Sequence, residues 1–362
     1  MLLNHRSFAI AETIIADADA LGVQCHTGAG GVRVVDCGVG TLGSHAAGRL
    51  LALAAMGGLG RVWVEPMGAH ASDFAAVWPD CQWPLVAVES DHPLTACLAA
   101  QYAGWKISSG GYFAMVSGPI RAAIGREPLY DSIEMGAGSR RERPTVAVGL
   151  LEAAKLPPND VCVSLAAEAN VAPKDLILLV ARTASSAGTL QVIARSLETA
   201  LHKLHDLHFD LRRIVRGSGR APLAPIPSPS DDLISIGRTN DAILYGGHVV
   251  LEVQGDDESL LEIGPRMVSR ASPAYGEPFC RLFAQAGGDF YAMDPSLFAP
   301  ALVDLINVDT GQQHRFGVIA ADIVASSFTA APASERAAAQ PPPTIAVPVQ
   351  RLAENKTDAS ES

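Results

Sequence analysis

Short apolar runs alternate with longer amphipathic segments along this chain, and that alternation limits the folds it can adopt. Strands are expected at residues 32–37 and 61–65, with a helix over residues 44–56 between them. Residues 176–181 form another strand-like run, and residues 190–207 have the spacing of one long helix. Because strands and helices must bury their apolar faces against each other, the pattern predicts a mixed α/β fold rather than a true Rossmann fold.

The length of the chain favours two domains over one. It has 362 residues, which is more than a single hydrophobic core usually serves. Residues 131–144 are polar and turn-rich, so we expect an N-terminal α/β domain over residues 1–143 and a C-terminal α/β domain over residues 144–328, layered around a central pocket. Residues 329–362 are rich in Ala, Pro and polar side chains without apolar periodicity, and this tail is expected to be disordered.

The charge of the chain excludes several classes of partner. A net charge of −11 disfavours nucleic acid, whose binding needs a basic surface, and it disfavours adsorption to an anionic membrane.

The longest apolar run, residues 50–59, is too short to cross a bilayer, and the N-terminus lacks the features of a secretion signal. Six scattered cysteines without metal-binding spacing are typical of free thiols in a reducing compartment. We therefore expect a cytoplasmic protein.

A glycine-rich turn after the first of these strands suggests a nucleotide site. Gly38, Gly40 and Gly43 form the pattern G-x-G-x-x-G between a strand and a helix, and Glu65 ends the next strand. In dinucleotide-binding folds such a turn presents backbone N–H groups to a pyrophosphate, and an acid at the next strand end binds the ribose. The same glycines also suit a tight strand-to-helix turn that binds no ligand. The residues alone leave both interpretations open.

Arg195 and Glu198 are three residues apart on the expected long helix. Together with Gln191 they lie on a polar face, opposite the apolar residues of the same helix. One interpretation is a guanidinium and a carboxylate that share a water molecule in a cleft. The other is an exposed ion pair, which contributes only a few tenths of a kcal/mol. By residue type alone the exposed pair is the more common case.

His202, His205 and His208 follow on the same helix at a spacing of three. Steps of three residues spread the imidazoles over roughly 120° of the helix surface, so one metal ion does not easily bind all of them. No metal site is therefore expected, and the three histidines are interpreted as surface residues.

Nine unusual strings, in order along residues 8–328, make the sequence recognisable. They are VVDCGVG (34–40), MGGLG (56–60), SDHPLTACLAAQYAGW (90–105), YFAMVSGPIRA (112–122), RTASSAGTLQVIARSLETA (182–200), GSGRAPLAPI (217–226), GRTNDAILYGG (237–247), YGEPF (275–279) and DFYAMDPSLFAPA (289–301). Together they resemble the methenyltetrahydromethanopterin cyclohydrolase family, and the match covers nearly the whole chain.

The resemblance implies a reaction at a cyclic cation in which one carbon bridges two nitrogens of a reduced pterin. Water attacks that carbon and the ring opens to the 5-formyl compound, in a step of one-carbon metabolism that oxidises formaldehyde towards formate. The carbon is already electrophilic, so the resemblance implies neither a metal nor a redox cofactor. The family's acting pair corresponds to Arg195 and Glu198, with Glu198 as the base and Arg195 keeping it ionised. Family members also carry a non-glycine where Gly40 stands, which favours turn glycines over a nucleotide site.

The substrate needs hydrogen bonds to its pterin and positive groups for its anionic tail. The candidates for contact with the pterin are Ser117, Thr183, Gln191, Asn240 and Asp241. The candidates for the tail are Arg220 and Arg238, which are expected on glycine-containing loops.

The resemblance also implies a homotrimer. Two other functions remain open: an NAD(P)-dependent oxidoreductase that uses the glycine-rich turn, and a pterin carrier that binds the substrate without converting it.

Overall fold

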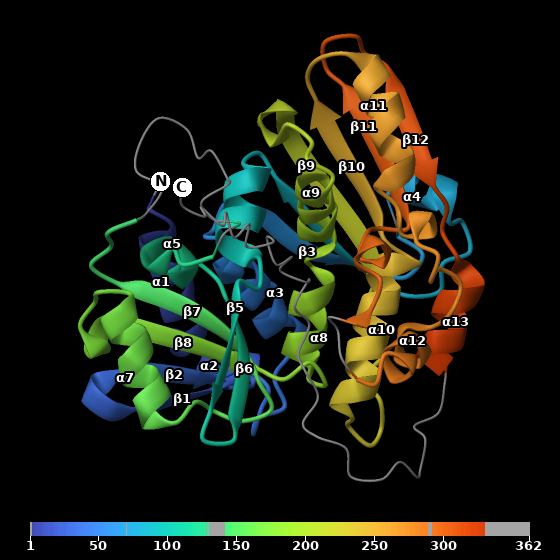
Figure 1. Cartoon of the computed structure of the whole chain (residues 1–362). Coiled ribbons are helices and arrows are strands. Elements are labelled where there is room, and N and C mark those ends of the chain that lie inside the picture. The colour runs from blue at the N-terminus through green and yellow to red at the C-terminus, as the bar shows by residue number, and fades with distance from the viewer. Residues whose placement is uncertain (1, 70, 128, 130–141, 289–291, 330–362) are drawn as a thin grey trace, which may run out of the picture.

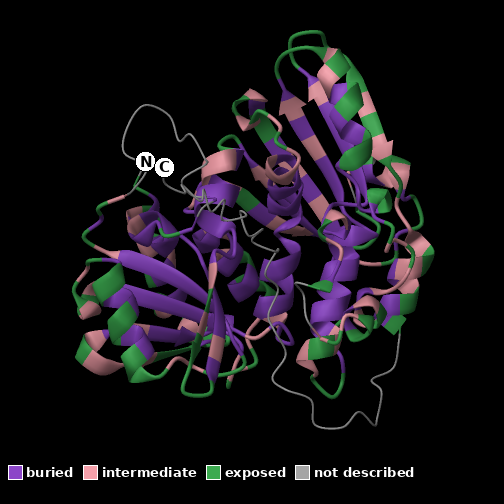
Figure 2. Cartoon of the chain, in the orientation of Figure 1, coloured by how far each residue is buried: buried purple, intermediate pink, exposed green. Residues whose placement is uncertain are grey.

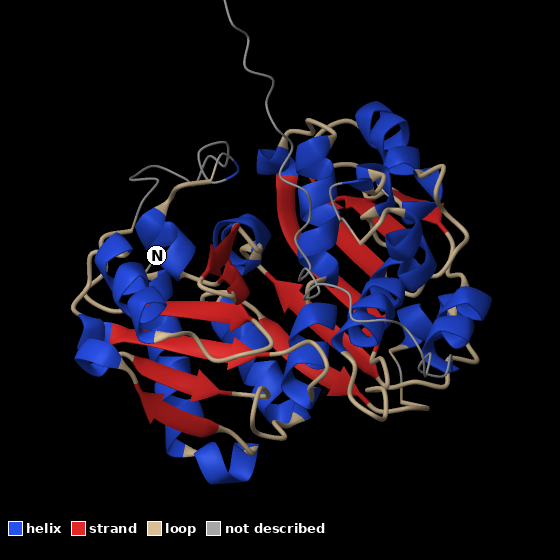
Figure 3. Ribbon diagram, turned by 60° about the horizontal axis from the view of Figure 1, so that its bottom comes forward, coloured by secondary structure: helices blue, strands red, loops and turns tan. Residues whose placement is uncertain are grey.

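The computed structural model describes residues 2–69, 71–127, 129, 142–288 and 292–329. Two six-stranded sheets lie side by side (Figure 3), and helices α3 (His45–Ala55) and α8 (Ser186–Ile193) lie between them (Figure 1). We call them sheet A, with the strand order β1-β2-β8-β7-β6-β5, and sheet B, with the order β12-β11-β10-β9-β4-β3. The mixed α/β fold expected from the sequence is confirmed.

Sheet A has a parallel centre and antiparallel sides. Its parallel strands are β2 (Arg33–Asp36), β8 (Leu176–Ala181) and β7 (Ala147–Glu152), and its antiparallel strands are β1 (Gln24–Thr27), β6 (Tyr112–Ser117) and β5 (Trp105–Ser109). Helices α1 (Leu3–Ala16) and α3 pack on one face, while α5 (Ile120–Ile124) and α7 (Asn159–Glu168) pack on the other. Because both faces are covered, every residue of β8 is buried (Figure 2).

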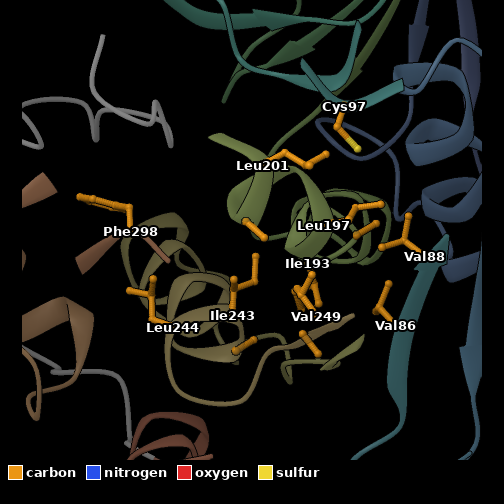
Figure 4. Packing of buried hydrophobic residues seen from close by; sticks show 14 of the residues in the cluster. Val86, Val88, Cys97, Ile193, Leu197, Leu201, Ile243, Leu244, Val249 and Phe298 are labelled. Atoms are coloured by element: carbon orange, nitrogen blue, oxygen red, sulfur yellow. The ribbon is translucent and has the colours of Figure 1, made fainter. Parts of the chain in front are cut away.

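Sheet B is mostly antiparallel, with one parallel pair between β10 and β11. Its strands are β3 (Arg61–Glu65), β4 (Leu85–Ser90), β9 (Ile214–Pro222), β10 (His248–Val253), β11 (Leu302–Asn307) and β12 (Gln313–Gly317). Helix α9 (Ser196–Asp206) packs across β4, β9 and β10. Leu197 and Leu201 of this helix belong to the same buried cluster as Val86, Val88 and Val249 of the sheet (Figure 4).

The other described helices and helical turns connect and cover these layers. They are α2 (Ala18–Leu21), η1 (Ala29–Gly31), α4 (Ser72–Val77), η2 (Leu94–Gln101), η3 (Pro173–Asp175), η4 (Leu211–Arg213), α10 (Asp232–Leu244), α11 (Asp257–Ile263), η5 (Gly264–Arg266), η6 (Ser269–Ala271), α12 (Phe279–Gln285), η8 (Pro295–Leu297) and α13 (Ala321–Thr329). Among the described helices, none combines the length and the apolar composition that a membrane span requires.

The two sheets interleave along the sequence. Strands β3 and β4, which precede residue 143, belong to sheet B, whereas β7 and β8, which follow residue 144, belong to sheet A. The expected division at residues 143 and 144 therefore does not separate the two sheets, because pairing between distant strands decides which of them share a sheet. Residues 131–141 of the expected junction and residues 330–362 of the expected tail lie outside the described residues, and Thr329 ends α13.

The single long helix expected over residues 190–207 is wrong. The chain forms α8 and α9 instead, which meet at Ala194 and Arg195, where the ψ angles are −1° and 6°. The amide of Gln101, 93 positions earlier in the chain, donates a hydrogen bond to the carbonyl oxygen of Ala194 at 3.3 Å. Local periodicity does not reveal a contact over that sequence distance, so the sequence predicted one continuous helix.

Gly48 marks a close approach of α3 to α8. A Cβ atom at this position would lie 2.8 Å from the carbonyl oxygen of Ala187 and 2.9 Å from the Cβ of Leu190. We expect Gly48→Val to lower the free energy of unfolding by about 1–3 kcal/mol through overpacking, although helix propensity alone favours valine over glycine. Chemical denaturation measures the change, with Ala46→Val on the exposed side of α3 as the control. Wild-type stability of Gly48→Val would contradict this packing.

Candidate active site

Three parallel strands of sheet A end at the same edge, and polar residues stand at each end. Strand β2 ends at Asp36, β7 ends at Glu152, and β8 is followed by Arg182 and Thr183. The carboxyl ends of parallel strands are the usual place of ligand sites in α/β sheets. Helix α8 starts from this edge, so the segment that carries the expected catalytic pair follows directly from it.

The glycine-rich turn after β2 binds an anion that belongs to the protein itself. The carboxylate of Asp36 accepts hydrogen bonds from the backbone N–H groups of Gly38 (3.0 Å), Val39 (2.7 Å) and Gly40 (2.8 Å). Burial acts against the charged form, but these bonds outweigh it and lower the pKa of Asp36. These three N–H groups are therefore not available to a pyrophosphate, which disfavours the nucleotide interpretation of this turn.

Arg220 and Glu65 are bonded to each other in sheet B, away from the glycine-rich turn. Arg220 lies on β9, not on a loop, because this segment pairs with β4 and β10. Its Nε donates to Glu65 at 2.9 Å and its Nη1 to Asp73 at 3.0 Å. The strand that Glu65 ends is in a different sheet from β2, so the two do not form one nucleotide-binding unit.

Arg195 occupies the break between α8 and α9 and is buried, with 6% of its surface exposed. Its Nη2 donates a hydrogen bond to the hydroxyl of Ser117 at the end of β6, at 3.1 Å. Its carbonyl oxygen accepts a hydrogen bond from the hydroxyl of Thr199, at 3.0 Å. The break thus places the guanidinium between the two helices and the edge of sheet A. Glu198 is buried as well, so the exposed ion pair is the wrong interpretation.

Glu198 lies in the first turn of α9 and is 1% exposed. Burial raises the pKa of its carboxyl group to about 7, although the positive charges of Arg195 and Arg121 act in the opposite direction. Asp206 raises this pKa further. A carboxyl group with such a pKa exchanges protons near neutral pH, which is the property required of a general base.

Glu152 is a second buried carboxylate at this site, and the sequence analysis missed it. It accepts a hydrogen bond from the hydroxyl of Thr183 at 2.7 Å and another from the side chain of Gln191. Burial raises its pKa, and the charge of Arg195 opposes that effect most strongly. The available signal was a lone acid at the end of the apolar run VAVGLLE, since such a run predicts a buried strand and hence a buried carboxylate.

A cavity of about 280 Å³ lies beside Glu152. Phe113 and Ile236 give it apolar walls, Thr183 lines it from the turn after β8, and Lys155 is an exposed cation along it. The other lining residues are Gly111, Ala153, Ala154, Arg182 and Asp232, of which the last two form an ion pair at 2.8 Å. Glu198 does not line this cavity, and its link to it is Arg195, which interacts electrostatically with both carboxylates.

Buried polar atoms without a partner gather around the helix break. They are Oε1 of Gln191, Nε of Arg195, Oγ of Ser196 and Oε1 of Glu198, none of which has a hydrogen bond within the described part of the chain. Leaving such an atom unsatisfied costs about 1–3 kcal/mol. Groups of this kind persist where they bind water or a substrate, so residues 191–198 are the candidate centre of the site.

Arg238, Asn240 and Asp241 lie on α10, because the segment expected as a loop is helical. Arg238 and Asn240 donate to backbone carbonyl oxygens, each with one bond of 2.8 Å. Asp241 accepts from the N–H of Phe279 at 2.8 Å and from the hydroxyl of Ser327 at 2.6 Å. The placement of Arg238 on a loop was wrong, and substrate contact by these three residues stays a prediction. Of the expected contacts, Ser117 is bonded to Arg195, and Thr183 and Gln191 are bonded to Glu152.

His202 is buried, contrary to the surface position expected for it, whereas His205 is half-buried and His208 is exposed. The His202 ring stacks on Tyr102 with the ring centroids 4.9 Å apart, and the guanidinium of Arg121 lies 5.0 Å from the Tyr102 centroid. Burial lowers the pKa of His202 to about 4, so its ring is neutral at neutral pH. Within the described ranges, no three His, Cys, Asp or Glu side chains are arranged to hold a metal ion.

The raised pKa of Glu198 predicts a stability that depends on pH. The folded protein binds the proton of the Glu198 carboxyl group more tightly than the unfolded chain does. The free energy of unfolding therefore falls as the pH rises from about 4.5 to about 7. Glu198→Gln removes this titration and should be more stable than wild type by up to roughly 3 kcal/mol at pH 8, with little difference at pH 4. Denaturation at both pH values measures the change, with the exposed Glu262→Gln as the control. A variant that is less stable than wild type at pH 8 would contradict it.

Comparison with known proteins identifies the family. A sequence model of the family described as "Cyclohydrolase (MCH)" matches residues 2–328. The methenyltetrahydromethanopterin cyclohydrolase of Xanthobacter autotrophicus is 43% identical over 319 residues, which cover 88% of this chain and 90% of that protein. Relatives of the same name from Methylobacillus flagellatus (40% identical; 90% of this chain, 95% of that protein) and Methanothermobacter marburgensis (35%; 90% and 98%) match over similar lengths. The chain therefore belongs to the cyclohydrolase (MCH) family.

Proposed function

We propose that this protein hydrolyses methenyltetrahydromethanopterin to 5-formyltetrahydromethanopterin. The observation that carries the proposal is the buried pair of Arg195 and Glu198 at the helix break, where each side chain has a polar atom without a partner among the described residues. The relatives named above, which cover about 90% of the chain, are methenyltetrahydromethanopterin cyclohydrolases.

The substrate carbon shares a positive charge with the two nitrogens that flank it, so water can attack it without further activation. As the water oxygen bonds to this carbon, Glu198 accepts a proton from the water. The hydroxyl group of the adduct then gives up its proton as the formyl carbonyl forms, and the bond from the carbon to the second nitrogen breaks. That nitrogen takes up a proton, and the formyl group stays on the first nitrogen. The cation and one water molecule thus give a neutral product and one proton.

The charges at the site suit this change. Arg195 attracts both Glu152 and Glu198 and lowers the pKa of each. When both carboxylates are ionised, the three groups together carry one negative charge, which complements the cationic substrate. The product is neutral, so the electrostatic attraction of the site is stronger for the substrate than for the product.

Three further features stay predictions: a cytoplasmic location, expected from the composition, and a homotrimeric assembly and the absence of a resident cofactor, both implied by the resemblance. The pterin carrier is the remaining alternative, and it would bind the substrate without any need for Glu198. The occupied N–H groups at Gly38 and Gly40 disfavour the NAD(P)-dependent alternative.

Glu198→Gln should retain substrate binding and lose most of the turnover. The amide keeps the shape of the side chain but accepts no proton, so we expect kcat to fall by about 10²- to 10⁴-fold. Loss of the methenyl absorbance follows the reaction, after subtraction of the uncatalysed rate, with Glu262→Gln as the control. Rapid turnover by Glu198→Gln would move the base elsewhere, and no turnover by wild type would favour the carrier.

Hydrolysis should increase with pH as Glu198 ionises. Its pKa of about 7 predicts that kcat/KM rises up to roughly that pH and is constant above it. Arg195→Gln removes the largest charge that lowers this pKa, so the midpoint should move to higher pH, while Arg195→Lys keeps the charge and should move it less. Rate profiles between pH 5 and pH 9 measure the shift. An unchanged midpoint in Arg195→Gln would show that Arg195 does not control the ionisation of Glu198.

A further inference from the structure

We propose that Glu152 binds the hydrogen-bond donor edge of the pterin, which consists of the exocyclic amino group and the neighbouring ring N–H. In this role Glu152 determines which heterocycle the protein accepts. The inference rests on the proposed function, because it names a binding residue for the same substrate.

The position of Glu152 in the cavity is the first argument. Its carboxylate stands at the end of β7, lines the cavity of about 280 Å³, and belongs to a residue that is only 6% exposed. Phe113 and Ile236 line the same space and can cover the faces of a flat ring. A small cavity with apolar walls and a buried charged acceptor is a typical site for a heterocycle that must be held in one orientation.

The acceptors along the cavity are the second argument. Asp232 also lines it, but its carboxylate accepts two N–H groups of Arg182, at 3.1 and 2.8 Å, and the backbone N–H of Ala184, at 3.0 Å. Glu152 accepts hydrogen bonds from the neutral donors Thr183 and Gln191 and is attracted by the charge of Arg195. A carboxylate has about four acceptor positions, so it can hold protein donors and the edge of a ligand together.

The chemistry of the pterin edge is the third argument. Its amino group and ring N–H are adjacent and point the same way, so they match the two oxygens of a carboxylate. Charge-assisted bonds of this type are roughly twice as strong as neutral ones. Arg195 interacts electrostatically with both Glu152 and Glu198, so a pterin held by Glu152 is linked through this arginine to the group that acts on the reacting carbon. Glu152 is thus the binding carboxylate and Glu198 the reacting one.

The test compares Glu152→Gln with wild type in the full-length protein. The amide presents an N–H group to the donor edge, so we expect the KM for methenyltetrahydromethanopterin to rise about 10- to 100-fold. The pH midpoint of kcat, set by Glu198, should stay within about half a unit of wild type. Glu65→Gln is the matched control, since Glu65 is also buried at a strand end and bonded to an arginine, but in sheet B. A fall in kcat with unchanged KM would overturn the inference and make Glu152 a proton donor to the leaving nitrogen.

A binding measurement separates this inference from the proposed function. Calorimetry with 6-methylpterin and 6-methyllumazine, in which an oxygen replaces the amino group, reports recognition of the edge without any reaction. Wild type should bind the pterin at least about tenfold more tightly, and Glu152→Gln should lose that preference. Equal affinities of the wild type for the two compounds would overturn the inference. This comparison needs only the wild type, so it holds even if Glu152→Gln does not fold. Failure of wild type to convert the methenyl substrate, with the preference intact, would reject the proposed function alone.

Discussion

The rest of the site depends on the attraction between the buried guanidinium of Arg195 and two buried carboxylates. Glu152 and Glu198 are both buried, and without a nearby positive charge each would be held in its neutral form. Arg195 opposes that effect at both carboxyl groups and is itself bonded to Ser117. Arg195 therefore links the two carboxylates, and its removal would leave two buried acids without their compensating charge.

The break between α8 and α9 positions this unit. Gln101 bonds the carbonyl oxygen of Ala194, and Ser117 bonds the side chain of Arg195, so two segments from earlier in the chain hold the turn. Sheet A contributes Glu152 at a strand end, while α9 packs on sheet B and contributes Glu198. The site is consequently complete only when both sheets and the two helices have packed together. At Gly48, α3 packs closely against Ala187 and Leu190 of α8, and this contact helps to position α8.

The glycine-rich turn shows how one local pattern can have two uses. Its backbone N–H groups do bind a negative charge, as the sequence pattern suggests, but the charge is the carboxylate of Asp36 at the end of the same strand. An internal carboxylate stabilises the turn and occupies the N–H groups of Gly38, Val39 and Gly40. The second strand of the expected nucleotide-binding unit belongs to the other sheet, and this difference in topology is not visible in the spacing of the glycines.

The sequence by itself determined the mixed α/β class and the approximate positions of β2, β3, β8 and α3, and its resemblance to one family pointed to Arg195 and Glu198. These depend on local periodicity and on ordered strings that resemble one family over nearly the whole chain. Only the tertiary structure decided that strands from both halves share each sheet, that the long helix breaks at Arg195, and that His202 is buried. It alone placed Glu152 beside Thr183, and it placed Arg220 on β9 and Arg238 on α10 instead of on loops. The physical reason is that burial, strand pairing and bonds between distant residues are set by how the whole chain packs, whereas sequence patterns report only neighbours along the chain.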